Sequence, residues 1–177
     1  MEIRTQSGQV MYESEFRTHM KETTGASWNQ TTDEVLQSLG ATVVFEGPQA
    51  SGGTVYQYSM RQGVEQIDGK WYTKYVLGPI FTDTPATDTE PAKTAAQNEA
   101  AYKAIKDAEQ AKSVRQTRDQ KLAETDWIVA KAVEQNAQDS LGIQIPVVWL
   151  TYRQALRDLP AQSGFPWTVV YPTQPTE

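Results

Sequence analysis

The sequence predicts an α+β fold: a small N-terminal antiparallel sheet domain, a linker, a long helix and a compact C-terminal helical module. Strand and turn signals dominate residues 1–81, whereas residues 92–124 are almost entirely good helix formers. Between them, residues 82–91 (TDTPATDTEP) carry two prolines, three acidic residues and no large apolar side chain. This composition is typical of a linker. Residues 125–177 make up the helical module.

Two short helices are expected in the N-terminal part. Residues 13–21 contain two large apolar side chains four residues apart, which places them on one helical face. A second helix is expected at residues 32–39, where Thr31 or Thr32 can cap the first turn. Gly40 follows as a helix stop, since glycine readily adopts the left-handed conformation found there.

Three strands are expected to form the sheet, at residues 41–45, 54–58 and 70–77. The first contains β-branched residues, and the other two alternate along the chain. Asp68-Gly69 precedes the last strand and indicates a tight hairpin turn, because both central positions of a type I′ turn need positive φ.

The long helix is predicted from residues 92–123, which contain nine alanines, no glycine and no internal proline. Its small side chains form a narrow stripe, made up of Ala101, Ala104, Ala108 and Ala111. This stripe is a candidate seam for self-association, although Arg115 and Arg118 interrupt it.

The last third of the chain predicts two more helices and a tail. One helix is expected from Trp127 to about residue 135, and Trp127 is expected to stabilise the module from that helix start. A polar loop at 136–145 leads to Pro146, which suits the first turn of a helix that ends near residue 159. Residues 164–175 form an extended tail that aromatic side chains are expected to fix in place.

Composition argues against several classes of function. The chain has no cysteine and one histidine, which leaves no thiolate site, no multi-histidine metal site and no convincing catalytic triad. No metal or cofactor is expected. Net charge is -6, which opposes nucleic-acid binding, and no apolar run approaches the length of a membrane helix. The first residues lack the apolar core of a signal peptide. An enzyme is therefore not expected.

A local basic cluster and a group of aromatic residues leave alternatives open. Lys112, Arg115, Arg118 and Lys121 read either as a phosphate-binding strip or, as we favour, a solvated helix face or a contact with an acidic partner. Large aromatic residues concentrate near the C-terminus: Trp127, Trp149, Tyr152, Phe165, Trp167 and Tyr171. Such side chains fill cores, but they also dominate protein–protein hot spots.

A series of short motifs from Arg118 onward resembles the C-terminal module of phage tail assembly chaperones, the tail fibre assembly proteins. The motifs are Arg118-Asp119, Leu122, Thr125-Asp126-Trp127, then Trp149-x-x-Tyr152-Arg153-Gln154-Ala155-Leu156-Arg157-Asp158-Leu159-Pro160, then Gln162-x-Gly164-Phe165-Pro166-Trp167 and Tyr171-Pro172. Residues 65–74 (EQIDGKWYTK) also resemble the strand pair upstream in such proteins. The connection from Trp127 to Trp149 is a few residues longer than the family pattern.

The resemblance implies a protein that binds a phage tail fibre polypeptide and assists its folding, trimerisation or attachment. It implies work in the host bacterial cytoplasm during assembly, with retention on the virion fibre as the alternative. The residues that would bind the partner or shape the module are Arg118, Asp126, Trp127, Trp149, Tyr152, Arg153, Arg157, Phe165, Trp167 and Tyr171. Arg153 and Arg157 are four residues apart and could hold a carboxylate or backbone carbonyls. Arg157 and Asp158 could instead cap the last helix.

Overall fold

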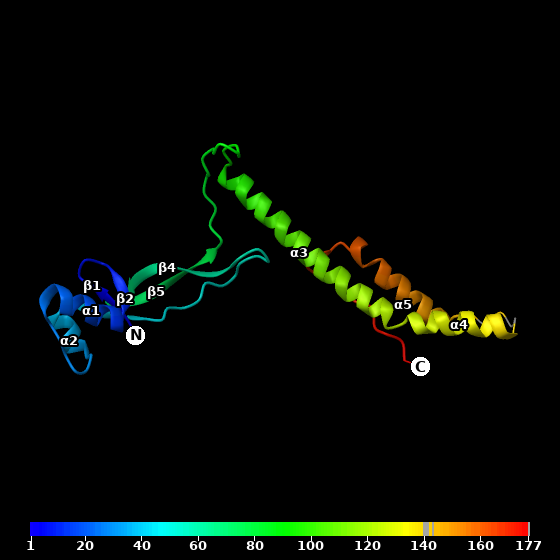
Figure 1. Ribbon diagram of the computed structural model, residues 1–177, viewed down its shortest axis with the longest axis horizontal. Coiled ribbons are helices and arrows are strands. Elements are labelled where there is room, and N and C mark those ends of the chain that lie inside the picture. Colours follow the sequence, from blue (N-terminus) through cyan, green and yellow to red (C-terminus); the bar gives the residue numbers. More distant parts are fainter. Residues whose placement is uncertain (140–141, 143, 177) are drawn as a thin grey trace. The chain divides into compact units, whose positions relative to one another are not determined.

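The chain forms two compact units, Met1–Ile80 and Phe81–Glu177 (Figure 1). The computed structural model describes residues 1–139, 142 and 144–176. The first unit is a five-stranded sheet with two helices, and the second is helical. This architecture confirms the α+β prediction.

The sheet of the first unit has the strand order β2-β1-β3-β5-β4. Its strands are β1 (Glu2–Thr5), β2 (Val10–Tyr12), β3 (Ala41–Phe45), β4 (Tyr58–Ile67) and β5 (Lys70–Gly78). Neighbouring strands are antiparallel except for β3 and β5, which are parallel, so the sheet is mixed rather than antiparallel throughout. Parallel neighbours need a connection of about a dozen residues or more. Here that connection contains residues 46–57 and the whole of β4, which pairs on the outer side of β5.

The hairpin prediction is confirmed, and one strand prediction is wrong. Asp68 and Gly69 both have positive φ, 47° and 78°, as the tight turn between β4 and β5 requires. The expected strand at 54–58 is absent, because Gln57 donates its backbone N–H to the Thr54 carbonyl in a turn. β4 begins only at Tyr58. The short strands β1 and β2 were not predicted.

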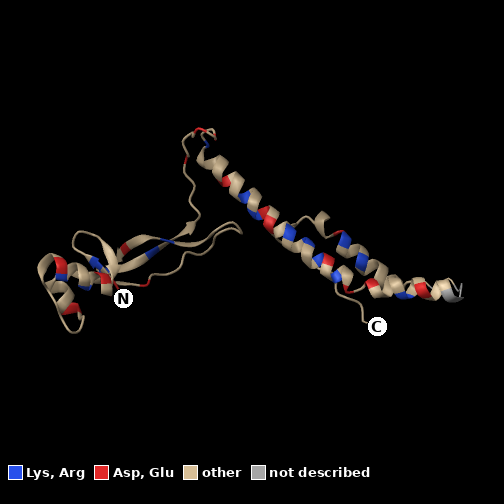
Figure 2. Ribbon diagram, in the orientation of Figure 1, with Lys and Arg blue, Asp and Glu red and all other residues tan. Residues whose placement is uncertain are grey.

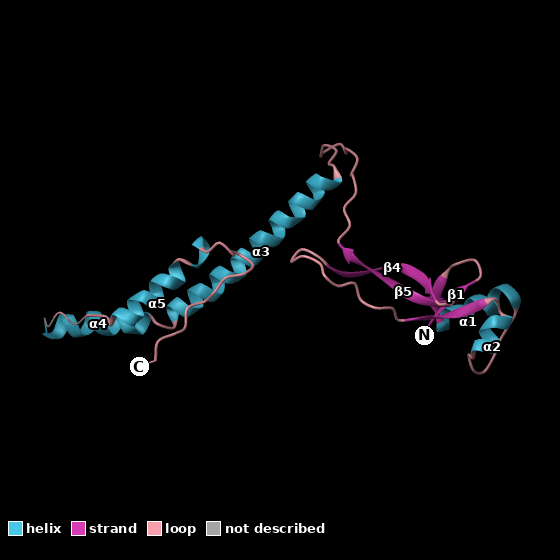
Figure 3. Ribbon diagram, turned by 180° about the vertical axis from the view of Figure 1, so that it is seen from behind, coloured by secondary structure: helices cyan, strands magenta, loops and turns pink. Residues whose placement is uncertain are grey.

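Two helices, α1 (Glu13–Thr24) and α2 (Asp33–Ser38), close the core of this unit over β1, β2 and β3 (Figure 3). The core consists of Ile3, Phe16, Met20, Leu36 and Ala41. Thr32 is the residue that caps α2, and Gly40 lies just beyond its end with φ of 66°. Both helix predictions are therefore confirmed.

The sheet is curled, so that side chains of β1 and β4 meet on the face that the helices do not cover. Arg61 on β4 donates two hydrogen bonds of 2.6 Å to the Glu2 carboxylate on β1, although β3 and β5 lie between these strands in the sheet order. A flat sheet would hold the two side chains too far apart, because neighbouring strands are about 4.8 Å from one another. The curl also shields Val44, which is 7% exposed on this face.

A hydrogen-bonded cluster joins the start of α1 to the segment before α2. The Glu13 carboxylate accepts hydrogen bonds from Arg17 and from the Thr31 hydroxyl, and Thr31 also accepts from the Trp28 indole at 2.8 Å. The Thr31 hydroxyl and then the Arg17 guanidinium lower the pKa of Glu13. A lowered pKa in the folded state means that the ionised carboxylate stabilises the fold. This contribution is present above the pKa of an unfolded glutamate, about 4.3. It is lost as pH falls through the lower folded value.

We predict that Glu13→Gln lowers the melting temperature at pH 7 and that the difference from wild type narrows as the pH falls below the pKa of an unfolded glutamate. The difference narrows because acid then protonates the folded wild-type carboxyl as well. Thermal melts across pH 3–7 measure this, with Glu22→Gln, an exposed position on the same helix, as the control. A difference that stays constant over this range would contradict the assignment.

The second unit is built on α3 (Ala95–Ala123), followed by α4 (Asp126–Asp139), α5 (Val147–Arg157) and a 3₁₀ turn at Leu159–Ala161. The three predicted helices are confirmed, with α4 longer than expected and Pro146 immediately before α5. α5 packs beside the C-terminal half of α3 (Figures 1 and 3).

The segment expected to be a linker, 82–91, is hydrogen-bonded to the start of α3. Thr84 and Lys93 form a backbone bridge, the Asp83 carboxylate accepts from the Ala95 N–H at 2.7 Å, and Asn98 donates to the Thr82 carbonyl at 2.8 Å. Thr94 completes the helix start as its cap. The bonds to Asp83 and Thr94 satisfy the N–H groups of Ala95 and Gln97, which the start of a helix leaves without partners.

Candidate functional site

The candidate site begins at the junction between α3 and α4. Only Glu124 and Thr125 separate the two helices. Thr125 is fully buried, and its hydroxyl donates to the Leu122 carbonyl at 2.9 Å. A threonine that bonds back to the preceding turn competes with helix continuation. The sequence marks this point as a helix start but does not reveal that Thr125 is buried.

Arg153 of α5 holds this junction together. One guanidinium nitrogen donates to the Leu122 carbonyl at 2.8 Å and to the Thr125 hydroxyl at 2.6 Å. The other donates to the Asp126 carboxylate at 2.7 Å. The cation thus lies at the C-terminal end of α3, where the helix dipole favours positive charge. Only arginine offers several fixed N–H donors for such a set of acceptors. Arg153 is 8% exposed, so its binding capacity is used within the chain.

An apolar core surrounds this arginine. It consists of Ile128, Trp149, Tyr152, Leu156 and Leu159, against which Leu122, Ile145, Val169 and Tyr171 pack. The rings of Trp149 and Tyr152 meet edge to face at 6.1 Å, a favourable aromatic geometry. Two of the predicted site residues, Trp149 and Tyr152, therefore lie inside the module.

The tail is fixed to α3 by its aromatic residues, as expected, but its first residues are not extended. The Thr168 N–H donates to the Gly164 carbonyl at 2.7 Å in a turn, so the extended part begins only after this turn. The Trp167 indole donates to the Asp107 carboxylate at 2.6 Å, and the Tyr171 hydroxyl donates to the Val114 carbonyl at 3.4 Å. The guanidinium carbon of Arg115 lies 5.3 Å from the centre of the Phe165 ring. Asp107 was not singled out from the sequence, because its partner is 60 residues away.

Trp127 lies differently from the expectation. Its side chain is 47% exposed, whereas its neighbour Ile128 is 7% exposed and belongs to the core. One position along a helix rotates the side chain by about 100°, which exchanges a buried direction for an exposed one. Ile128, rather than Trp127, is therefore the residue at the start of α4 that belongs to the core.

Two further candidate residues, Arg118 and Arg157, contribute differently. Arg118 pairs with its neighbour Asp119 at 2.7 Å, whereas Arg157 is exposed at the end of α5. Arg153 and Arg157 do not hold one group together, because Arg153 is committed to the helix junction.

The outward side of α5 carries exposed apolar side chains. Val147, Val148 and Leu150 are 74%, 57% and 47% exposed. A shallow hollow continues along the helix from Leu150 and is lined by Leu150, Thr151, Gln154, Ala155, Arg157 and Asp158. We call Val147, Val148, Leu150 and this hollow the α5 face. It combines apolar surface with one exposed arginine, a composition found at protein–protein contacts.

Charged side chains in the described part of the second unit are further candidates for an anion or metal site. Acidic and basic residues are interspersed along α3 (Figure 2). Two of the four residues of the basic cluster, Arg115 and Arg118, contact Phe165 and Asp119. Among the residues that the structure describes, no group of three or more His, Cys, Asp or Glu side chains could hold a metal ion. None of the helices in this described part is long and apolar enough to cross a membrane.

Comparison with known proteins finds one similarity, which covers the C-terminal part of the chain. Residues 111–176 match the family model described as phage tail assembly chaperone protein. No curated protein matches the chain significantly, and no solved structure does. The match covers a little over a third of the sequence and includes the end of α3, the Arg153 junction, the α5 face and most of the tail. Residues 111–176 of this chain are therefore similar to the phage tail assembly chaperone proteins.

Proposed function

We propose that this protein is a tail fibre assembly chaperone that binds the fibre polypeptide and assists its folding, trimerisation or attachment. The observation that carries the proposal is the α5 face, an apolar surface on a helix whose other side is fixed by Arg153 and the core. The chaperone family domain supports a role in tail assembly and an interaction with phage tail proteins.

The physical basis of the proposed activity is protection of unfinished subunits. Before it trimerises, a fibre chain exposes apolar surface and unpaired strand edges, which promote aggregation. Contact with Val147, Val148 and Leu150 would bury part of that surface, and Arg157 would add a directed polar contact at the edge. Binding of this kind involves no bond-making step, so the proposed role is non-enzymatic and needs no cofactor.

A second candidate function is that of a structural component that stays on the mature tail fibre. The half-exposed Trp127, beside the domain's helix junction, favours a lasting contact, since tryptophan is enriched where stable interfaces concentrate their binding energy. Both functions place the protein in the host bacterial cytoplasm during assembly. They differ in whether the protein is found in purified virions.

Co-expression with the fibre gene of the same phage tests the proposal. Size-exclusion chromatography with mass measurement is expected to give a complex, and soluble fibre only when this chain is present. Its recovery from purified virions would favour the structural component. Fibre that is soluble and trimeric without this chain, together with no co-elution, would contradict the chaperone proposal.

We predict that Leu150→Glu weakens the fibre complex at least about tenfold while leaving the melting temperature within about 2 °C of wild type. The side chain is 47% exposed, so a charge there is solvated in the free protein but desolvated in a complex. Gln116→Glu adds the same charge at an exposed position of α3 and serves as the control. Equal affinities of the two variants would exclude Leu150 from the interface.

A further inference from the structure

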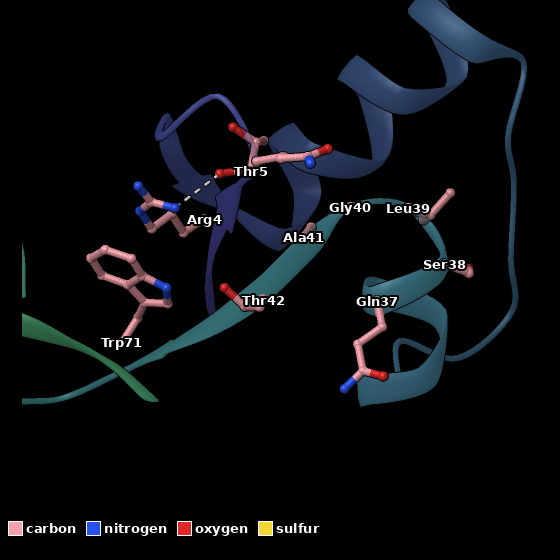
Figure 4. Close-up of a pocket in the computed structure, with 10 residues that line it drawn as sticks. Arg4, Thr5, Gln37, Ser38, Leu39, Gly40, Ala41, Thr42 and Trp71 are labelled. Atoms are coloured by element: carbon pink, nitrogen blue, oxygen red, sulfur yellow. Dashed lines mark hydrogen bonds between the residues drawn. The ribbon is translucent and has the colours of Figure 1, made fainter. Parts of the chain in front are cut away.

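A polar pocket in the first unit lies outside the chaperone domain and has no part in the proposed function. It opens between the turn after β1, the end of α2 and the start of β3, and Trp71 of β5 forms one side (Figure 4). Its volume is about 670 Å³, within the range of ligand-binding sites. Ten residues line it: Arg4, Thr5, Gln6, Gln37, Ser38, Leu39, Gly40, Ala41, Thr42 and Trp71.

Arg4 supplies the charge of this pocket. Its guanidinium group lies next to the Trp71 ring (Figure 4), and the guanidinium carbon is 3.8 Å from the centre of that ring. One terminal nitrogen donates to the Thr5 carbonyl at 3.3 Å. Its Nε atom is buried and has no hydrogen-bond partner in the described part of the chain. No carboxylate lies within 4 Å of this guanidinium in the same described residues. In a protein of net charge -6, a half-buried arginine with no acidic partner is unusual.

The rest of the pocket is neutral and able to form hydrogen bonds. No acidic residue lines it. The side chains of Gln6, Gln37 and Thr42 make no hydrogen bond to any other residue that the structure describes. Carboxamides and hydroxyls both donate and accept, which matches the N–H and C=O groups of a peptide backbone.

Two glycines leave room for the side chains of Arg4 and Gln6 beside the backbone. Gly8 has φ of 92°, and a Cβ atom there would lie 3.3 Å from the terminal Nη2 of Arg4. Gly40 has φ of 66°, and a Cβ atom there would lie 3.3 Å from Oε1 of Gln6. Both positions favour glycine because of their backbone conformation as well. The arrangement therefore depends on the two turns that carry these glycines.

From this geometry we propose that the pocket binds a carboxylate presented by a peptide segment of a partner protein. The Arg4 guanidinium would pair with the carboxylate, and Gln37 and Thr42 would bind the flanking backbone. A single cation matches the single charge of a carboxylate, and guanidinium binds that group through two parallel hydrogen bonds. A phosphate dianion would call for a second cation or a helix N-terminus, neither of which lines the pocket. Stacking on Trp71 holds the guanidinium plane and lowers the ordering cost of binding.

The test uses the full chain and short peptides. Acetyl-Gly-Glu-Gly-amide carries a side-chain carboxylate, acetyl-Gly-Gln-Gly-amide is its neutral match, and acetyl-Gly-Gly-Gly with a free C-terminus carries the carboxylate at the chain end. Inorganic phosphate is the fourth probe. NMR titration follows the Trp71 indole N–H and the Arg4 Nε–H signals. We expect at least one carboxylate peptide to shift both signals and to bind at least about tenfold more tightly than the glutamine peptide. The tighter of the two shows whether a side chain or a chain end is preferred.

Variants connect the signal to the pocket. Arg4→Gln is expected to abolish carboxylate binding, and Arg4→Lys to retain part of it, since lysine keeps the charge but not the paired donors. Gln37→Ala removes an exposed side chain, so it should lower affinity without changing the melting temperature. Lys131→Gln, on the exposed surface of α4, is the matched charge control and should bind as wild type does.

Three outcomes would overturn the proposal. The first is that neither carboxylate peptide, the glutamate peptide or the one with a free C-terminus, binds more tightly than the neutral glutamine peptide. The second is unchanged binding in an Arg4→Gln protein that melts as wild type does, or, if that variant does not fold, unchanged binding in both Arg4→Lys and Gln37→Ala. The third is phosphate binding more tightly than either carboxylate peptide. None of these measurements involves the fibre protein, so they are independent of the proposed chaperone function.

Discussion

Arg153→Ala is expected to lower the free energy of unfolding of the second unit by about 3 kcal/mol. The substitution removes the donor from the Leu122 carbonyl, the Thr125 hydroxyl and the Asp126 carboxylate at once. It also removes the aliphatic stem of a side chain that is 8% exposed. Burial of a guanidinium has a desolvation cost that alanine would relieve. The Leu122 carbonyl keeps the Thr125 hydroxyl as a donor, and the Asp126 carboxylate is exposed to water. We still expect the loss to dominate, because the buried Thr125 hydroxyl oxygen is left without a donor, which costs about 1–3 kcal/mol, and the packing of the arginine stem is lost as well.

Urea unfolding followed by tryptophan fluorescence measures this effect, because Trp149 lies in the same core. Arg153→Lys is expected to lose about half as much, since one ammonium cannot reach all three acceptors in the same geometry. Arg157→Ala, on the exposed side of the same helix, is the matched control and is expected to lie within about 0.5 kcal/mol of wild type. A similar midpoint for Arg153→Ala and Arg157→Ala would refute the role of Arg153 at the junction.

Local sequence signals predicted most helices of this fold and failed where partners are distant in sequence. Thr32, Gly40, Asp68-Gly69 and the alanine-rich α3 carry their own conformational preferences, so their neighbours alone predict the structure. By contrast, β1 and β2 are only four and three residues long, and β1 is largely polar. They are strands because β1 pairs with β2 on one side and with β3 on the other. Pairing of this kind leaves no recognisable pattern in the seven residues of the two strands.

The direction of β5 beside β3 is a second non-local feature. An antiparallel neighbour is the natural expectation for short strands joined by a tight hairpin, and β4 and β5 obey it. Residues 46–57 place β4 on the far side of β5, which makes β3 and β5 parallel. Nothing in the composition of residues 46–57 indicates that β4 pairs beyond β5 and not directly with β3.

The candidate site shows the same division. The aromatic residues were found because of their type, and the family motifs placed Arg153 among the significant residues. That Arg153 binds its own chain depends on a carbonyl 31 residues earlier, and backbone carbonyls carry no sequence signal. The prediction that Trp127 would stabilise the module, where Ile128 is in fact the core residue, failed for a different reason. α4 is only moderately amphipathic, so its periodicity could not decide which of two adjacent apolar residues faces the core.

The contrast between two tryptophans separates folding from binding in this domain. Trp149 is 8% exposed and packs against Tyr152 and the rest of the core. Removing such a side chain leaves a cavity, so Trp149→Ala is expected to lower the free energy of unfolding by about 4 kcal/mol. Trp127 is 47% exposed, so Trp127→Ala is expected to change it by less than about 1 kcal/mol. Urea unfolding of both variants gives these values.

The effects of Trp149→Ala and Trp127→Ala on fibre binding should be in the opposite order to their effects on stability, at temperatures where both variants are folded. If Trp127 lies in the contact with the fibre, Trp127→Ala weakens the complex at least about tenfold although its stability is near that of wild type. Trp149→Ala should weaken the complex only as far as it unfolds the domain. Binding by this variant should therefore fall on warming and return on cooling. Co-elution with fibre at two temperatures distinguishes the two behaviours. A Trp127→Ala protein that binds fibre as wild type does would remove α4 from the interface and leave the α5 face as the contact, because its apolar side chains lie on a separate helix.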